Sequence, residues 1–209
     1  MNRVVIACAG ARKTTELVNC ALQHSNRKVL IVTYTINNYN QIIERIYQIA
    51  GHIPPNIEVQ TWFTFLLSEG VRPYQNYLYS DARIKSIAFV CGISSIGRKK
   101  SDIRRYYLCS NDLIFTDKMA DFICEVNKLS CGKVINRLER VYDAIYIDEV
   151  QDLAGYDLCV LELLFNSSIH MYVVGDCRQA TYYTNQSRKN RDCSKTITIL
   201  RCFTRALGE

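Results

Sequence analysis

The sequence contains little glycine or proline and no long apolar run. Only 9 Gly and 3 Pro occur among 209 residues, too few for a low-complexity linker, a collagen-like repeat or a disordered tail. No stretch approaches the roughly 20 uninterrupted apolar residues that a membrane helix needs, and no N-terminal signal segment is recognisable. These absences predict a compact, soluble globular protein with no membrane partner.

Cysteine is abundant by comparison. The chain has 10 Cys, a number that in a small secreted domain would suggest a disulfide framework. However, Cys8, Cys20, Cys124 and Cys159 lie inside apolar runs, where cysteine behaves as a small hydrophobic residue. We therefore expect reduced thiols in a cytoplasmic protein.

Short apolar runs rich in Val and Ile alternate with helical patterns along the chain. The runs predict buried strands and the periodic segments predict amphipathic helices. We expect strands at 3–9, 28–34, 57–61, 142–148 and 169–176, and helices at 13–24, 36–50 and 152–165. This alternation predicts an α/β fold with a parallel sheet and helices on both faces, which binds ligands beyond the carboxyl ends of its strands.

Residues 71–135 break the alternation. They show helical periodicity, for example at Met119, Ile123 and Val126, but no clear buried strand. The predicted organisation is one core domain made of residues 1–70 and 136–209, with a mostly helical insertion at 71–135.

The positive charge is concentrated in the middle of the chain. The net charge is +6, and residues 71–140 alone carry an excess equal to that total. The densest part comprises Arg98, Lys99, Lys100, Arg104 and Arg105, followed by Tyr106 and Tyr107. Basic and aromatic side chains together suit a nucleic-acid backbone and its bases. A solvated helix face explains so short a cluster equally well, and both interpretations stay open.

A candidate phosphate-binding loop follows the first strand. It ends in Gly10, Ala11, Arg12, Lys13, Thr14 and Thr15, between a strand and a helix, which is the context that such a loop requires. In this role Lys13 would reach the β and γ phosphates and the Thr14 hydroxyl would coordinate Mg²⁺. Arg12 stands where the Walker pattern has Gly, so its side chain must turn out of the loop. An ordinary strand-to-helix turn is the alternative.

An acidic pair follows the strand at 142–148. Asp148 could hold Mg²⁺, usually through water, and Glu149 could act as general base on the water that attacks a phosphate. An Asp-Glu pair after a strand is also commonly a helix N-terminal cap. Because the pair and the loop occur in one alternating fold, we favour the phosphate chemistry.

Five segments, in this order and spacing, resemble the motifs of superfamily 1 helicases of the UvrD/Rep type. They are the loop Ala7 to Thr14, Thr33 to Asn37, Thr61 to Phe65, the Asp-Glu-x-Gln-Asp segment Asp148 to Asp152, and Val173 to Tyr182 with its Gln179. The resemblance implies a RecA-like P-loop NTPase domain, the 1A domain of a helicase, with an insertion like domain 1B.

The same resemblance implies cofactors, partners and roles. ATP and Mg²⁺ would bind at Lys13, Thr14 and Asp148. Glu149 would activate water, and Gln179 would sense the γ phosphate. Single-stranded DNA would lie in a groove lined by Thr35, Asn37, Thr61, Trp62 and Phe63. Trp62 and Phe63 could instead be core residues, as aromatic residues after a buried strand usually are.

Two functional hypotheses follow. The first is an ATP-hydrolysing DNA motor domain, which would need a second RecA-like domain and would hydrolyse ATP slowly or not at all alone. The second is a non-catalytic, helicase-like binding subunit of a defence or repair complex, an expectation favoured by Arg12, by the missing adenine-recognising motif and by the missing second domain. Ala180 to Asn185 resembles the helicase-like subunits of Gabija-type anti-phage systems, which implies a nuclease or helicase-partner protein.

Overall fold

The computed structural model describes residues 2–7 and 12–176. Its centre is a parallel sheet with the strand order β1-β7-β6-β2-β3. The strands are β1 (Arg3–Ile6), β2 (Val29–Thr33), β3 (Ile57–Thr61), β6 (Ala144–Ile147) and β7 (His170–Gly175). The predicted α/β fold with a parallel sheet is confirmed.

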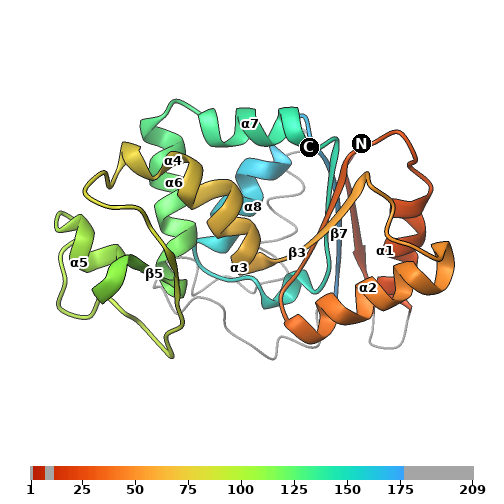
Figure 1. Ribbon diagram of the computed structural model, residues 1–209, viewed down its shortest axis with the longest axis horizontal. Helices are drawn as coiled ribbons and strands as arrows, with labels where there is room; N and C mark the ends of the chain where they lie inside the picture. The colour runs from red at the N-terminus through yellow and green to blue at the C-terminus, as the bar shows by residue number, and fades with distance from the viewer. Residues whose placement is uncertain (1, 8–11, 177–209) are drawn as a thin grey trace.

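Helices cover both faces of this sheet (Figure 1). The helices α1 (Lys13–Leu22) and α2 (Ile36–Ala50) pack on one face, and α3 (Trp62–Phe65), α6 (Met119–Leu129), α7 (Lys133–Val141) and α8 (Asp157–Phe165) lie on the other. The sheet has a hydrophobic core on each face, and alternate residues of β2 point into one core or the other. Val29 and Ile31 pack with α1 and α2, and Leu30 and Val32 pack with the second group. This alternation is what a strand buried on both faces requires.

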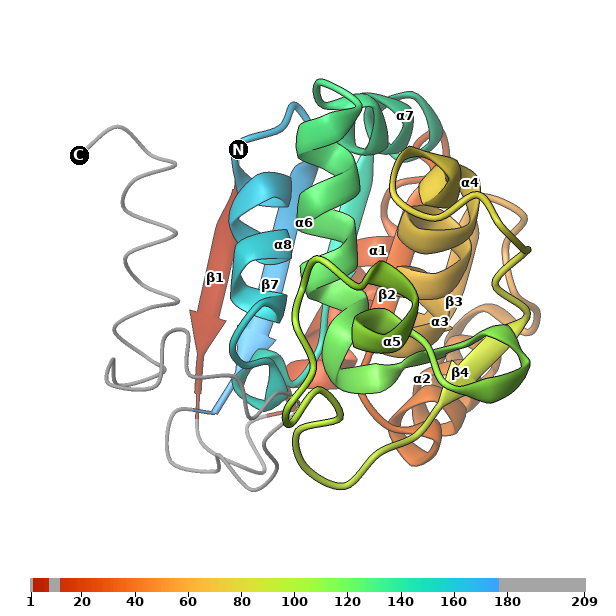
Figure 2. The same ribbon diagram turned by 90° about the vertical axis from the view of Figure 1, so that its left-hand side faces the viewer.

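The segment between β3 and α6 is built from short elements. A π-helix η1 (Leu66–Val71) continues α3 and is followed by α4 (Arg72–Tyr74), η2 (Gln75–Tyr77), β4 (Ser86–Ala88), α5 (Ile103–Tyr107), η3 (Ser110–Asp112), β5 (Leu113–Phe115) and η4 (Thr116–Lys118). The strands β4 and β5 form a separate parallel pair, which lies beside α5 (Figure 2). Ile114 and Phe115 are buried, so the expectation of no buried strand in this region was wrong.

Two further expectations need correction. The strand β1 is not buried on both faces, because it pairs with β7 alone among the described strands and leaves Ile6 41% exposed. The helix predicted at 152–165 begins only at Asp157. A short turn η5 (Val150–Asp152) precedes it, and Gly155 has a φ of 58°, which interrupts a right-handed helix.

The helices of the described residues include none with the length and apolar character needed to cross a bilayer. Of the cysteines in the same residues, Cys20, Cys91, Cys109 and Cys131 are free thiols.

Candidate functional site

Three chain segments meet at the carboxyl edge of the sheet. Because β7 lies between β1 and β6, the start of α1 and the acidic end of β6 lie on either side of the end of β7. The Thr14 hydroxyl donates a hydrogen bond to Asp148 Oδ2 at 2.8 Å. Lys13 Nζ lies 3.9 Å from Asp176 Oδ2, just after β7. The structure thus brings together Lys13, Thr14 and Asp148 from segments 134 residues apart.

Lys13 is held inside the protein. Its side chain is only 8% exposed, and Nζ donates to the Ala7 carbonyl at 2.7 Å. A buried ammonium needs such partners, because burial without them carries a large desolvation cost. In this arrangement the lysine bridges the two ends of the loop, at the place where a phosphate would be expected.

Arg12 shows why the Walker pattern has Gly before the Lys. Its φ is 54° and its ψ 29°, in the left-handed region, which costs a residue with a Cβ roughly 1–2 kcal/mol. The Arg12 side chain is exposed, as it must be if phosphate is to fit in the loop. Thr15 is half-buried in the first turn of α1, and the predicted residues Gly10 and Ala11 lie outside the described residues.

Asp148 is almost completely buried, with 2% of its surface exposed. This burial raises the pKa of its carboxyl from 3.8 to about 6. The bond from Thr14 and the Lys13 charge oppose that rise, and the Glu149 charge adds to it. A bound cation would favour the charged carboxylate. Hydroxyl and carboxylate oxygens are the ligands that Mg²⁺ takes in proteins, alongside substrate phosphates. Thr14 and Asp148 therefore fit a magnesium site.

Glu149 has an unusual backbone and a fixed side chain. Its φ is 56°, and its N–H donates to Asp148 Oδ1 at 3.0 Å. The Gln151 side chain donates to Glu149 Oε2 and accepts from Asp176 N at 3.0 Å. Gln151 thus links the Glu149 carboxylate to the end of β7. Glu149 makes no side-chain capping bond to η5, which argues against a role as a simple helix cap.

Gly175 allows Gln151 to approach β7. A Cβ at position 175 would lie 2.7 Å from Gln151 Oε1 and 2.8 Å from Val150 Cγ1, closer than such atoms pack. The predicted γ-phosphate sensor Gln179 lies outside the described residues.

The residues predicted to line a DNA groove divide into two groups. Thr35 follows β2 and caps α2, accepting a hydrogen bond from Asn38 N at 3.1 Å. Thr61 is the last residue of β3 and caps α3, accepting from Thr64 N at 3.3 Å. Both are half-buried, and Asn37 is exposed in the first turn of α2. These residues lie at one edge of the sheet and already have a structural role.

Trp62 is a core residue, which corrects its prediction as a DNA contact. It is 1% exposed, and its indole N–H donates to Asp157 Oδ1 at 3.0 Å. Its ring packs beside Phe65, with centroids 5.6 Å apart. A base could not stack on Trp62 unless the side chain left the core, so the core interpretation of Trp62 is the better one.

Phe63 belongs instead to a row of three rings. Its ring centroid lies 5.5 Å from that of Tyr34 and 5.8 Å from that of Phe89, which it meets edge to face. Phe89 is 76% exposed. The backbone of the next residue is anchored, because Val90 N donates a hydrogen bond to Thr116 Oγ1 at 3.3 Å. Burial and nearby carboxylates raise the pKa of Tyr34 to about 12, so this ring is neutral.

The five-residue basic cluster does not form a single surface. Lys100 Nζ contacts Asp121 at 2.8 Å and Glu125 at 2.9 Å. Partial burial lowers the pKa of Lys100, but the bonds to Asp121 and Glu125 outweigh it and hold this pKa above its ordinary value. Lys100 therefore ties the insertion to α6, which corrects its prediction as a DNA contact. Lys99 is exposed, and the three arginines line one pocket of the insertion.

Sequence reasoning gave no role to four residues of this edge. Gln151 and Asp176 lie within quoted motifs, and Tyr34 is the middle residue of the Thr-x-Thr segment, so the motifs themselves contained the signal. Phe89 lies in no motif. The only sequence signal for Phe89 was an aromatic residue in a segment that shows no pattern of buried positions.

The family model of the UvrD/REP helicase N-terminal domain matches residues 73–188, more than half of the chain. The chain belongs to the UvrD/REP helicase N-terminal domain family. The matched segment includes Asp148, Glu149 and β7, while Lys13 and Thr14 precede it. The fold is that of a RecA-like domain, the match places the chain in a family of helicase-type ATPases, and helicases of this family generally use ATP and Mg²⁺. Comparison with curated proteins gives no match.

Proposed function

We propose that this UvrD-like domain binds ATP with Mg²⁺ at the edge formed by β1, β6 and β7, and couples the nucleotide to a bound single DNA strand. The observation that carries the proposal is the contact between the Thr14 hydroxyl and the Asp148 carboxylate at 2.8 Å, with Lys13 beside them. These are the lysine, hydroxyl and carboxylate that phosphoryl transfer on a P-loop uses.

Each residue has a chemical role in this proposal. Mg²⁺, when bound, would neutralise phosphate charge, and Thr14 and Asp148 would hold it. Lys13 would leave the Ala7 carbonyl and contact the β and γ phosphates. Glu149 would accept a proton from the attacking water, and the Gln151 side chain would orient its carboxylate for that step. Gln179 would sense the γ phosphate, as the family resemblance implies.

The DNA strand would cross the carboxyl ends of β2 and β3. The rings of Tyr34, Phe63 and Phe89 offer a row on which successive bases can stack, each base contributing about 1–3 kcal/mol. The first turn of α2, which contains Asn37, has backbone N–H groups without helical partners, a favourable place for a phosphate. Thr35 and Thr61 cap the first turns of α2 and α3 and keep both helices in position.

A second function has its own support. The strained backbone of Arg12 and the engagement of Lys13 by Ala7 and Asp176 favour a helicase-like subunit that holds nucleotide or a partner without turnover. Such a subunit would act in the cytoplasm, beside a nuclease or a partner helicase domain, for example in a Gabija-type antiviral defence or in repair. In either case we expect the isolated chain to hydrolyse ATP very slowly or not at all.

A nucleotide titration tests the proposal. A fluorescent ATP analogue should bind the purified chain in the presence of Mg²⁺, and Lys13→Ala should abolish this binding because the cation facing the phosphates is gone. Lys99→Ala, which removes an exposed charge elsewhere, is the matched control and should bind as the parent does. Equal affinity of the parent and Lys13→Ala would refute the nucleotide site.

Turnover distinguishes the two functions. Robust DNA-stimulated ATP hydrolysis by the purified chain, lost in Glu149→Gln, would establish a motor domain that needs no partner. Hydrolysis that appears only when a second RecA-like domain is added would support the motor domain as proposed.

A further inference from the structure

Three arginines of the basic cluster line a single pocket in the insertion. Arg98, Arg104 and Arg105 surround it together with Leu108, Ser110 and Phe115, and it has a volume of about 670 Å³ and opens to solvent. Among the described residues, the charged side chains that line it are all arginines. We propose that this pocket binds a phosphodiester group of a nucleic-acid strand, separately from the nucleotide loop. The inference rests on the proposed function, because it extends the path of the strand.

Arg98 is already oriented by the protein. One of its N–H groups donates to the Arg105 carbonyl at 2.8 Å, and its guanidinium lies 5.4 Å from the centroid of the Phe115 ring. Phe115 is itself buried in β5, so the ring supports the guanidinium from a fixed position. An arginine has five N–H donors, and fixing it in advance reduces the entropy cost of binding an anion.

The ion pairs of the other two arginines are long. Arg104 Nη2 lies 3.5 Å from Asp112 Oδ1, and Arg105 Nε lies 3.7 Å from Asp102 Oδ2. The two arginine side chains are 55% and 80% exposed. The exposed pair of Arg105 with Asp102 is of the kind that contributes roughly 0–1 kcal/mol. Asp112 is only 14% exposed, but Lys85 Nζ at 3.7 Å is a second partner for its carboxylate. Because arginine binds phosphate through two parallel charged hydrogen bonds, little opposes a shift of both side chains to a phosphate.

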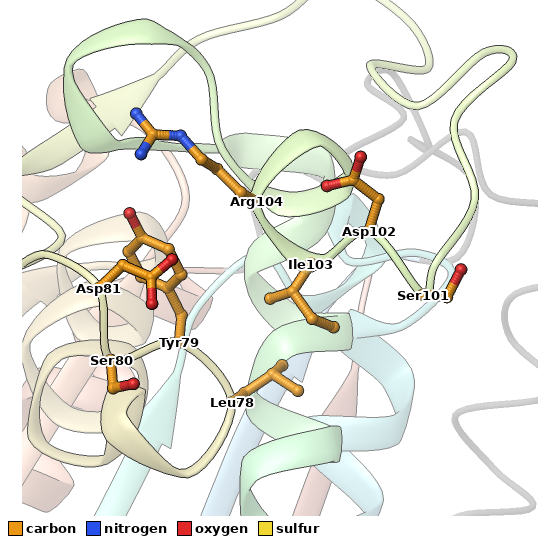
Figure 3. Close-up of a pocket in the computed structure, with 8 residues that line it drawn as sticks. All are labelled: Leu78, Tyr79, Ser80, Asp81, Ser101, Asp102, Ile103 and Arg104. Atoms are coloured by element: carbon orange, nitrogen blue, oxygen red, sulfur yellow. The ribbon is translucent and has the colours of Figure 1, made fainter.

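Two pockets that share Arg104 differ in their other charged residues. Figure 3 shows the second pocket, of about 580 Å³, where Asp81 faces Ser101 and Asp102 across the opening. These carboxylates would repel a phosphate. The guanidinium of Arg104 extends past the Tyr79 ring, away from the Asp102 carboxylate (Figure 3). Arg98 and Arg105 line only the arginine pocket, so an anion is favoured there over the neighbouring pocket.

The pocket continues the surface proposed for DNA. Ala88 of β4 is paired with Phe115 of β5, and Phe89, the last ring of the row, follows Ala88 directly. Neighbouring strands lie about 4.8 Å apart. A strand stacked on Phe63 and Phe89 thus reaches the backbone beside the ring that supports Arg98. This continuity favours a phosphate within a polymer over a free nucleotide.

A binding experiment with two triple variants tests the pocket. The probe is a fluorescent oligothymidylate of about 16 nucleotides, and the variants are R98Q/R104Q/R105Q and the control R27Q/K128Q/R140Q. The control removes the same charge from exposed side chains on other elements. The pocket variant should bind about tenfold or more weakly at low salt. In a plot of the logarithm of the binding constant against the logarithm of the salt concentration, the slope of this variant should be shallower by about 0.7 for each phosphate that the arginines no longer neutralise. Equal affinity and slope in the two variants would overturn the pocket.

A chemical footprint on the unaltered protein gives a second readout. Cys109 also lines the pocket, whereas Cys131 is exposed between α6 and α7. The oligonucleotide should slow alkylation of Cys109, measured by mass spectrometry, relative to alkylation of Cys131. Protection by tripolyphosphate but not by the oligonucleotide would overturn a nucleic-acid site. Binding without protection of Cys109 refutes the pocket alone, whereas no oligonucleotide binding by the parent refutes both the pocket and the proposed DNA surface.

Discussion

Replacing Asp148 with Asn should stabilise the protein at neutral pH while weakening its magnesium site. The Asn amide is neutral and nearly the same shape, and it can accept the bond from Glu149 N and donate to the Thr14 hydroxyl. The substitution therefore removes the cost of a buried charge while preserving both local contacts. Functional sites commonly carry such a stability cost.

The magnitude follows from the pKa of Asp148. The value rises from 3.8 to about 6 on folding, so between these pH values the folded protein binds more protons than the unfolded chain. Stability must therefore fall as pH rises through this window. A rise of about two pKa units corresponds to about 3 kcal/mol lost above pH 6. The Asn variant has no such group and should not lose this stability.

Urea unfolding of parent and variant near pH 4.5 and pH 7.5 measures the effect, because other titrating groups cancel in the difference. The advantage of Asn should grow by about 2 kcal/mol between the two pH values, because part of the loss has already occurred at pH 4.5. Magnesium with nucleotide should then stabilise the parent more than the variant. A difference between the two proteins that does not change with pH would refute the account of Asp148 as a costly buried carboxylate.

Three other substitutions test separate features. Trp62→Ala should lower the free energy of unfolding by about 3–5 kcal/mol, whereas Phe63→Ala should cost less stability but weaken oligothymidylate binding; the reverse pattern would return Trp62 to the DNA surface. Arg12→Gly should relieve the left-handed backbone and stabilise the fold by up to about 1 kcal/mol, which a denaturant midpoint at or below that of the parent would contradict. Gly175→Ala should destabilise the domain by about 1–3 kcal/mol through its clash with Gln151 and Val150, and an unchanged melting temperature would show that the two side chains move aside easily.

The core of the fold could be predicted because its central strands are short, nearly uninterrupted apolar runs. Residues 29–33 and 144–147 are buried at every position, and their Val and Ile content indicated this directly. The strands β4 and β5 have three residues each, too few to show a period of two. The edge position of β1 depends on the order of the strands in the sheet, and the sequence of β1 alone does not indicate that order.

The site could be predicted only where the motif determines the geometry. The spacing of Lys13, Thr14 and Asp148 placed them at neighbouring strand ends, and the structure brings them into contact. The roles of Trp62 and Lys100 depended on partners distant in sequence. Asp157 lies 95 residues after Trp62, and Asp121 lies 21 residues after Lys100. Composition and local pattern do not indicate such pairs, so a charged or aromatic cluster alone could not show which side chains face solvent.

The magnesium dependence of ATP binding tests the central claim most directly. Calorimetric titrations with and without Mg²⁺ would be run on the parent, Thr14→Val, Asp148→Asn and the double variant. Mg²⁺ should strengthen binding in the parent. Each single variant should lose most of that gain and the double variant little more, since both side chains act on one ion. A magnesium effect that survives unchanged in Thr14→Val and Asp148→Asn would contradict the assignment of this edge as the nucleotide site.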